Sequence, residues 1–260
     1  MLGPAALACI WLGATPWTLL IALAVALLTW EWVHLCGLRT RALPGMAVPV
    51  AVLAAGILAV AEHPRASLLA LLVGWAITWW TAARLRPPEA PRQPAGWLAI
   101  GVLYIGLAGI ALIELRHDNQ AGRANVLFLF LVVWASDIGA YMAGRAFGGP
   151  KLAPAVSPNK TWSGAAGGLA AAVVVGVATA AALAPGGASR AAAVAAMLGV
   201  MAQAGDLLES WIKRRFDVKD TSSLIPGHGG LLDRLDGVIA AAPVAALLAF
   251  ALGQGQPLWR

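Results

Sequence analysis

The sequence predicts an all-α, polytopic integral membrane protein with eight or nine transmembrane helices. Of its 260 residues, 60% are hydrophobic and only 12% are charged, whereas a soluble domain carries about 25% charged residues. The apolar residues form unbroken stretches close to the roughly 20 residues that a bilayer-spanning helix needs. These stretches are rich in Ala and Leu and lack the two-residue alternation of a membrane β-barrel. Backbone within lipid must satisfy its own hydrogen bonds, which also favours helices.

The expected helices follow one another along the whole chain. They are predicted at about 2–15, 17–36, 46–61, 67–83, 96–114, 124–143, 164–184, 190–208 and 237–256. The first stretch is short and Pro16 separates it from the second, so the number of spans is eight or nine. We expect two regions, N-terminal transmembrane helices in 1–120 and a C-terminal catalytic region in 121–260.

Two helix ends can be predicted in more detail. No Gly or Pro follows Gly205 until well past Phe216, so the helix that begins near 190 should continue to about 216. Its length would then exceed the ~30 Å hydrocarbon core. Ser157 and Pro158 are typical of an N-cap and a first helical residue, which predicts that the next helix opens there. The spacings Gly144-xxx-Gly148 and Gly164-xxx-Gly168 would allow close helix packing.

The basic residues predict which side of the membrane each connection faces. Alternate connections, near 37–45, 84–95, 144–163 and 209–236, hold 13 of the 18 Lys and Arg residues, and the opposite side holds five. An excess of Lys and Arg is typical of cytoplasmic loops. The net charge of +6 is therefore interpreted as a cytoplasmic loop signal and not as a nucleic-acid surface. Cys9 and Cys36 are isolated and predict no metal site.

Charge is concentrated in one segment, from Asp206 to Asp236. These 31 residues contain six of the twelve acids and five of the bases. Ionisable groups at or near membrane depth usually mark a functional site, although a solvated loop is the alternative. A Glu209–Lys213 pair, four residues apart on one helix, accounts for those two side chains but leaves Asp206 without an obvious partner. The Gly-rich turn at 226–230 could present backbone N–H groups to an anion.

A second polar segment lies between 136 and 162. Asp137 falls within an apolar helix, where a carboxylate needs a cation or a proton. Asn159, Lys160 and Thr161 follow at the expected helix start, which already favours phosphate. Glu31 is a weaker candidate, and Trp30 and Trp32 beside it are interpreted as part of an interfacial aromatic belt.

These residues resemble a known family. The pattern S-x-x-K-R-x4-K-D-x5-PGHGG-x-x-DR-x-D, which runs from Ser210 to Asp236, is similar to the signature of the phosphatidate cytidylyltransferases, also called CDP-diacylglycerol synthases. The segment from Trp134 to Gly168, with SDIGAY and SPNKTW, and the Trp30-Glu31-Trp32 motif also resemble that family. Ser163 stands where relatives often carry Glu or Gln, and Gly237 where they often carry Ser.

The resemblance implies transfer of CMP from CTP to phosphatidic acid, giving CDP-diacylglycerol and pyrophosphate, at the cytoplasmic face of the cell membrane. It implies Mg²⁺, with K⁺ as a candidate second cation, and a homodimer. Clustered carboxylates suit Mg²⁺, which prefers oxygen ligands. The expected metal ligands are Asp220, Asp236, Asp206, Asp137 and Asp233, and Lys219 and Lys213 join the first three of these as catalytic residues. The expected substrate-binding residues are Ser157, Asn159, Lys160, Thr161, Ser210, Arg214, His228, Gly229, Gly230 and Arg234.

Other functions fit the sequence less well. A CTP-dependent polyprenol- or phytol-kinase-like enzyme shares parts of this architecture, but the complete PGHGG-x-x-DR-x-D segment favours the cytidylyltransferase. The sequence lacks the DG-x2-AR pattern of CDP-alcohol phosphotransferases. An ion-coupled transporter would use Asp137 and Asp206 in an ion pathway, yet it would not need so dense a cluster of Lys, Arg and Gly.

Overall fold

A computed structural model describes residues 2–85, 95–118, 121–184, 186–224, 229–252 and 255–260. Within these residues every predicted apolar stretch forms a helix, and the chain is nearly all-α. The helices are α1 (Leu2–Leu12), α2 (Ala14–Leu35), α3 (Ala47–Val60), α4 (Pro64–Arg84), α5 (Ala95–His117), α6 (Gly122–Phe147), α7 (Trp162–Leu183), α8 (Ala188–Arg215) and α9 (Leu232–Leu252).

Seven of these helices are long and apolar enough to cross a membrane. The helices α1 and α3 are shorter apolar helices, so the expected eight or nine spans are not confirmed. α8 has 28 residues, or about 42 Å at 1.5 Å per residue. It ends at Arg215, which confirms the predicted extension beyond the apolar stretch.

The chain forms two compact units that are not consecutive halves. The first unit contains residues 1–114 and 216–234, and the second contains 115–215 and 235–260. The described residues of 216–234 thus group with the N-terminal helices. The helix α9 begins in the first unit and continues in the second.

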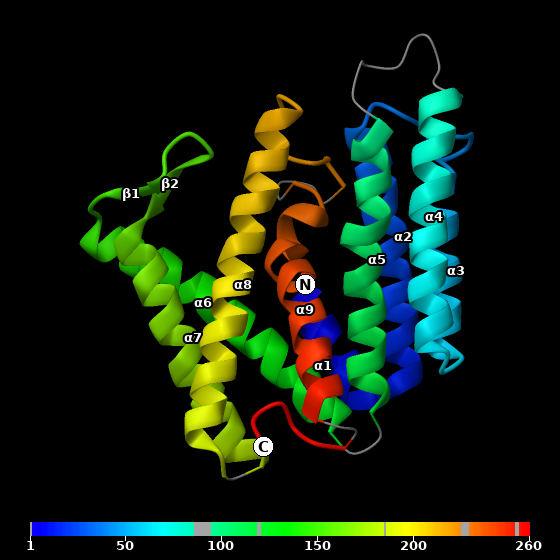
Figure 1. Cartoon of the computed structure of the whole chain (residues 1–260). Coiled ribbons are helices and arrows are strands. Elements are labelled where there is room, and N and C mark those ends of the chain that lie inside the picture. Colours follow the sequence, from blue (N-terminus) through cyan, green and yellow to red (C-terminus); the bar gives the residue numbers. More distant parts are fainter. Residues whose placement is uncertain (1, 86–94, 119–120, 185, 225–228, 253–254) are drawn as a thin grey trace. The chain divides into compact units, whose positions relative to one another are not determined.

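In the first unit, small residues allow helices α2 to α5 to pack closely (Figure 1). A β-carbon at Gly74 in α4 would collide with Ala51 in α3, and one at Gly101 in α5 would collide with the indole of Trp32 in α2. The Trp17 indole N–H also donates to the carbonyl oxygen of Leu112 at 2.8 Å. These close contacts fix the position of α2 within the bundle.

In the second unit, α6, α7 and α8 pack side by side (Figure 1). A β-carbon at Gly164 would lie 3.4 Å from the Cα atom of Gly144, and one at Gly167 would collide with Ala143. The predicted close packing is therefore found at Gly144 and Gly164. Gly148 does not take part, because it ends α6 with φ 59° and has open space around it.

A short β-hairpin joins α6 and α7, which an all-α fold did not predict. Strand β1 (Lys151–Ala153) pairs antiparallel with β2 (Ser157–Thr161), with Lys151 opposite Thr161. The expectation that α7 opens at Ser157 is wrong. The N-cap is Thr161, whose hydroxyl oxygen accepts from the Gly164 N–H at 3.1 Å. Ser163 then donates to the Gly148 carbonyl oxygen, which ties the start of α7 to the end of α6.

The C-terminal residues pack into the second unit. Trp259 is fully buried, stacks on Phe128 with ring centroids 4.7 Å apart and donates its indole N–H to Ala184 O at 3.1 Å. Asn125 accepts from the Leu258 N–H at 2.9 Å. The tail therefore links α6 to the C-terminal end of α7.

Candidate functional site

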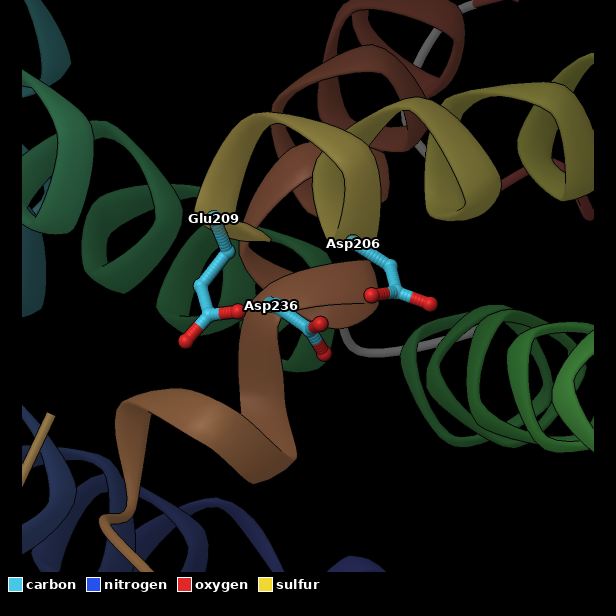
Figure 2. Close-up of side chains that lie close together, drawn as sticks. All are labelled: Asp206, Glu209 and Asp236. Carbon is cyan, nitrogen blue, oxygen red and sulfur yellow. The ribbon is translucent and has the colours of Figure 1, made fainter. Parts of the chain in front are cut away.

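Three carboxylates of the second unit, which we call the carboxylate cluster, converge between α8 and α9. Asp206 and Glu209 lie one turn apart on α8, and Asp236 lies on α9. One oxygen of each lies within 4.8 Å of one oxygen of each of the others, and Figure 2 shows the three side chains reaching toward one another. Gly205 allows this approach, because a β-carbon there would lie 2.6 Å from the Asp236 carbonyl oxygen.

Two lysines neutralise part of the cluster. Lys160 of β2 places its Nζ 2.6 Å from Asp206 Oδ2. Lys213 places its Nζ 2.7 Å from Glu209 Oε2, and the Glu209 side chain is only 1% exposed. The predicted Glu209–Lys213 pair is thus confirmed. Asp206, which had no partner by sequence, obtains one from the hairpin.

Asp137 of α6 lies within electrostatic range of Asp206 and Lys160. The four carboxylates carry a formal charge of −4 and the two lysines +2, which leaves −2. One turn before Asp206, Gln203 Nε2 donates to Ser136 Oγ at 3.2 Å and to the Ala165 carbonyl oxygen at 3.1 Å. These hydrogen bonds hold together three helices next to the carboxylates.

The cluster has the chemistry of a divalent cation site. Its available atoms are carboxylate oxygens, which are the ligands that Mg²⁺ and other hard cations take. Together with Asp137, the cluster keeps a formal charge of −2 after the two lysines, which equals the charge of one such ion in magnitude. Asp206, Glu209 and Asp236 are therefore the described residues that could hold the metal.

In the first unit, Asp233 accepts hydrogen bonds from described residues of the segment 219–233. Its Oδ2 accepts from the Thr221 N–H and hydroxyl, each at 3.0 Å, and from the Gly230 N–H at 2.8 Å. Gly229 has φ 79°, and a β-carbon there would lie 3.1 Å from Asp233 Oδ2 and 3.4 Å from Asp220 Oδ1. The Gly230 N–H, expected to face substrate, is instead donated within the segment.

The predicted site residues are divided between the two units. The second unit brings together Asp137, Lys160, Asp206, Lys213 and Asp236. In the same unit, Thr161 caps α7, and Arg214 Nε donates to the Val156 carbonyl oxygen at 3.4 Å. Ser157 and Asn159 lie on β2, and Ser210 lies on α8. The first unit holds Lys219, Asp220, Gly229, Gly230, Asp233 and Arg234, of which Lys219 and Asp220 are exposed. His228 lies outside the described residues.

Sequence reasoning missed two acids. Glu209 was explained by its pair with Lys213 alone, although its spacing of three residues from Asp206 in one helix could have indicated a shared cluster. Glu31 was treated as a weak candidate between two belt tryptophans, yet its side chain is completely buried. No local pattern reveals its partners, because they lie about 190 residues later in the chain.

Comparison with known proteins shows the family to which the chain belongs. Residues 1–252 match the model of the cytidylyltransferase family. A phosphatidate cytidylyltransferase of Brucella suis is 42% identical over 252 residues, which cover 95% of this chain and 89% of the relative. That of Pseudomonas aeruginosa is 37% identical over 247 residues, 92% of this chain and 89% of the relative. The chain therefore belongs to the phosphatidate cytidylyltransferase family, and it is a nucleotidyltransferase.

Proposed function

We propose that this enzyme transfers CMP from CTP to phosphatidic acid at the cytoplasmic face of the membrane, with Mg²⁺ at the carboxylate cluster. The observation that carries the metal site is the convergence of Asp206, Glu209 and Asp236 within 4.8 Å. The substrates follow from the relatives, whose names give phosphatidate as the cytidylyl acceptor.

The reaction depends on electrostatic stabilisation and does not require a general base. The phosphate oxygen of the lipid is already an anion near neutral pH, so it can attack the α-phosphorus of CTP directly. A new P–O bond forms, the bond from the α-phosphorus to the bridging oxygen breaks, and pyrophosphate leaves with the electron pair. The main barrier is the approach of two anions, which positioned cations lower.

The chain supplies these cations from three elements. Lys160 lies on β2, Lys213 and Arg214 lie in the last turn of α8, and Lys219 follows in the next segment. We propose that Lys160 and Lys213 hold phosphate groups. Each lysine is paired with a carboxylate. A substrate phosphate could take over this ion pair without a large movement of the ammonium group.

Mg²⁺ held by Asp206, Glu209 and Asp236 would supply charge stabilisation at the transferring phosphoryl group. Asp137 would add negative charge behind these ligands. Asp220 and Asp233 remain proposed metal ligands because the family resemblance implies them. K⁺ as a second cation and a homodimer remain proposals that the family resemblance carries.

The orientation proposal rests on where the basic connections gather within each unit. In the first unit, Trp97 at the start of α5 packs against Phe216 with ring centroids 5.5 Å apart, and the end of α2 meets Ser222. In the second unit, the hairpin meets the end of α8 through Arg214. Within each unit, these described ends of the basic connections therefore lie close together, which supports placing them on one side of the membrane, as for cytoplasmic loops.

One assay tests the reaction. Purified protein in detergent receives CTP, Mg²⁺ and phosphatidic acid, and both pyrophosphate and CDP-diacylglycerol are measured. We expect equal amounts of the two products and none when EDTA replaces Mg²⁺. Release of CDP with a newly phosphorylated lipid would indicate a lipid kinase instead, and a lack of Mg²⁺-dependent product from folded protein would contradict the proposal.

Labelling of single cysteines tests the orientation. Arg84→Cys and Ser223→Cys, each in a Cys9→Ser background, should react with a membrane-impermeant maleimide only from the cytoplasmic side. Ala61→Cys should react only from the opposite side. Labelling of residues 84 and 223 from different sides would overturn the orientation.

A further inference from the structure

Glu31 is a buried carboxylate in the first unit. It lies near the C-terminal end of α2, and its side chain is 0% exposed. Burying a carboxylate is costly unless hydrogen bonds or an opposite charge compensate for lost water. The compensation that the structure shows for Glu31 is a set of hydrogen bonds.

Three donors from one distant segment surround this carboxylate. Oε1 accepts from the Ser222 hydroxyl at 2.6 Å and from the Leu231 N–H at 2.7 Å, and Oε2 accepts from the Leu232 N–H at 2.8 Å. Leu232 is the first residue of α9, where N–H groups have no partner within the helix. The positive end of the helix dipole also favours an acid at this position.

Glu31 and Asp233 together hold both ends of one segment. Asp233 accepts hydrogen bonds from Thr221 and Gly230. Glu31 accepts hydrogen bonds from the adjoining Ser222, Leu231 and Leu232. We call these two carboxylates and their donors the loop clasp. It has no room to spare at Gly230, where a β-carbon would collide with Thr221 Oγ1 and lie 2.8 Å from Glu31 Oε1.

We infer that Glu31 is a positioning residue for cytidylyl transfer, which acts by fixing the segment that carries Lys219 and Asp220 and the first turn of α9. Ser222 is two residues after Asp220, and Leu232 is four residues before Asp236 in the same helix. A shift of the segment would therefore displace residues on both sides of it. This inference rests on the proposed function for its effect on turnover, but its structural part does not.

The charge and both oxygens of Glu31 matter for this role. In Glu31→Gln, one carboxylate oxygen becomes an NH₂ group, which is a donor. It would then face a backbone N–H, so at least one of the three hydrogen bonds becomes a contact between two donors. Glu31→Asp keeps two acceptor oxygens and the charge on a side chain shorter by one methylene, so it should keep part of the clasp.

The experiment compares Glu31→Gln and Glu31→Asp with Glu62→Gln, an exposed acid in the same unit. Hydrogen exchange of the full-length protein in detergent is measured by mass spectrometry without substrate. We expect faster exchange in peptides that contain Leu231 and Leu232 in Glu31→Gln, an intermediate rate in Glu31→Asp, and no change in Glu62→Gln. Peptides from α6 and α7 should exchange as in the parent protein.

Turnover is then measured on the same preparations. Loss of a residue that orients the groups of an active site, without itself contacting substrate, typically costs about 10- to 100-fold in activity. We expect kcat to fall by that factor in Glu31→Gln, KM for phosphatidic acid to stay within about twofold, and Glu31→Asp to recover part of kcat. If Glu31 only stabilised the fold, its replacement would lower the amount of folded enzyme and leave kcat per folded molecule unchanged.

The possible failures can be distinguished. Unchanged exchange at Leu231 and Leu232 in Glu31→Gln, or unchanged kcat, would overturn the inference. If Glu31→Gln does not fold, Ser222→Ala removes one donor and should give smaller changes of the same kind; its lack of any effect would equally overturn it. Failure of the parent protein to form CDP-diacylglycerol would contradict the proposed function while leaving the exchange result valid.

Discussion

The loop clasp and the carboxylate cluster both contain acids in an apolar protein, but they compensate the negative charge differently. Glu31 and Asp233 accept backbone N–H groups and hydroxyls from a single segment. Asp206 and Glu209 face lysine ammonium groups. Backbone donors cannot leave without unfolding the segment, whereas an ammonium on a flexible side chain can move to another anion. The first arrangement fixes structure, and the second allows charge to be exchanged during a reaction.

The largest expected effect is a loss of turnover when an acid of the carboxylate cluster is replaced, compared with replacement of an exposed acid. Asp236→Asn removes one charged oxygen ligand, and a metal ion supplies several kcal/mol of transition-state stabilisation, so turnover should fall on the order of 10³-fold. Asp206→Asn should act similarly, and Asp220→Asn tests the further ligand in the same assay. Product formation is measured together with gel filtration in detergent to confirm folding.

Asp217→Asn is the matched control for this series. Asp217 is exposed and has φ 55°, a conformation that Asn also tolerates. It should keep near-normal turnover. Near-normal activity of Asp236→Asn would show that the cluster does not hold the metal.

The second prediction concerns the exchangeable charge. Lys160→Met removes the ammonium beside Asp206, so the remaining acids repel one another more strongly and should bind Mg²⁺ more tightly. CTP loses a phosphate-binding cation at the same time, and a hydrogen bond involving a charged group contributes roughly 1.5–3 kcal/mol. We therefore expect KM for CTP to rise about 10- to 100-fold, while the Mg²⁺ concentration for half-maximal activity falls.

Lys151→Met provides the comparison within the same hairpin. Lys151 is exposed and lies at the start of β1. It should change KM for CTP by less than about threefold, in keeping with the small effect of an exposed charge. Equal changes in the two variants would mean that Lys160 acts only through the overall positive charge of the hairpin.

The third prediction disturbs the loop clasp without removing a carboxylate. Gly230→Ala places a methyl group against Thr221 and Glu31, and overpacking a tight site typically costs about 1–3 kcal/mol. Thermal unfolding in detergent should show lower stability. Gly96→Ala in the first turn of α5, with nothing within 4 Å of the added carbon, should be neutral. An unchanged unfolding temperature in Gly230→Ala would contradict the tight packing of the clasp.

The smallest effect concerns a buried cysteine in the first unit. Cys36 follows α2, and burial raises the pKa of its thiol to about 12, because an apolar surrounding disfavours the thiolate. Only a very small fraction is ionised at pH 8, and the thiolate is the reactive form. Native protein should therefore incorporate no maleimide at Cys36 at pH 8, whereas protein unfolded in denaturant should react. Rapid labelling of the native Cys36 would show that this end of α2 is accessible.

The positions of the helices could be predicted from sequence because apolar length is a local property. The hairpin could not, since Ser157 and Pro158 are typical of a helix start and only the pairing of Lys151 with Thr161 makes them a strand. Asp206 and Asp236 were predicted as site acids from their position in an apolar chain, and the structure brings them together. The partners of Glu31 depend on contacts between residues about 190 positions apart, which no local spacing encodes.

The cap at Thr161 also limits how the charges near Asp206 can rearrange. Thr161 ends β2 and accepts the first side-chain hydrogen bond of α7, so the backbone of its neighbour Lys160 cannot shift without disrupting the start of the helix. Only the side chain of Lys160 is free to change its position. Rotamer changes take place in picoseconds to nanoseconds, whereas collective domain motions need microseconds to milliseconds. A change in the position of this ammonium would therefore be much faster than any collective movement of the chain.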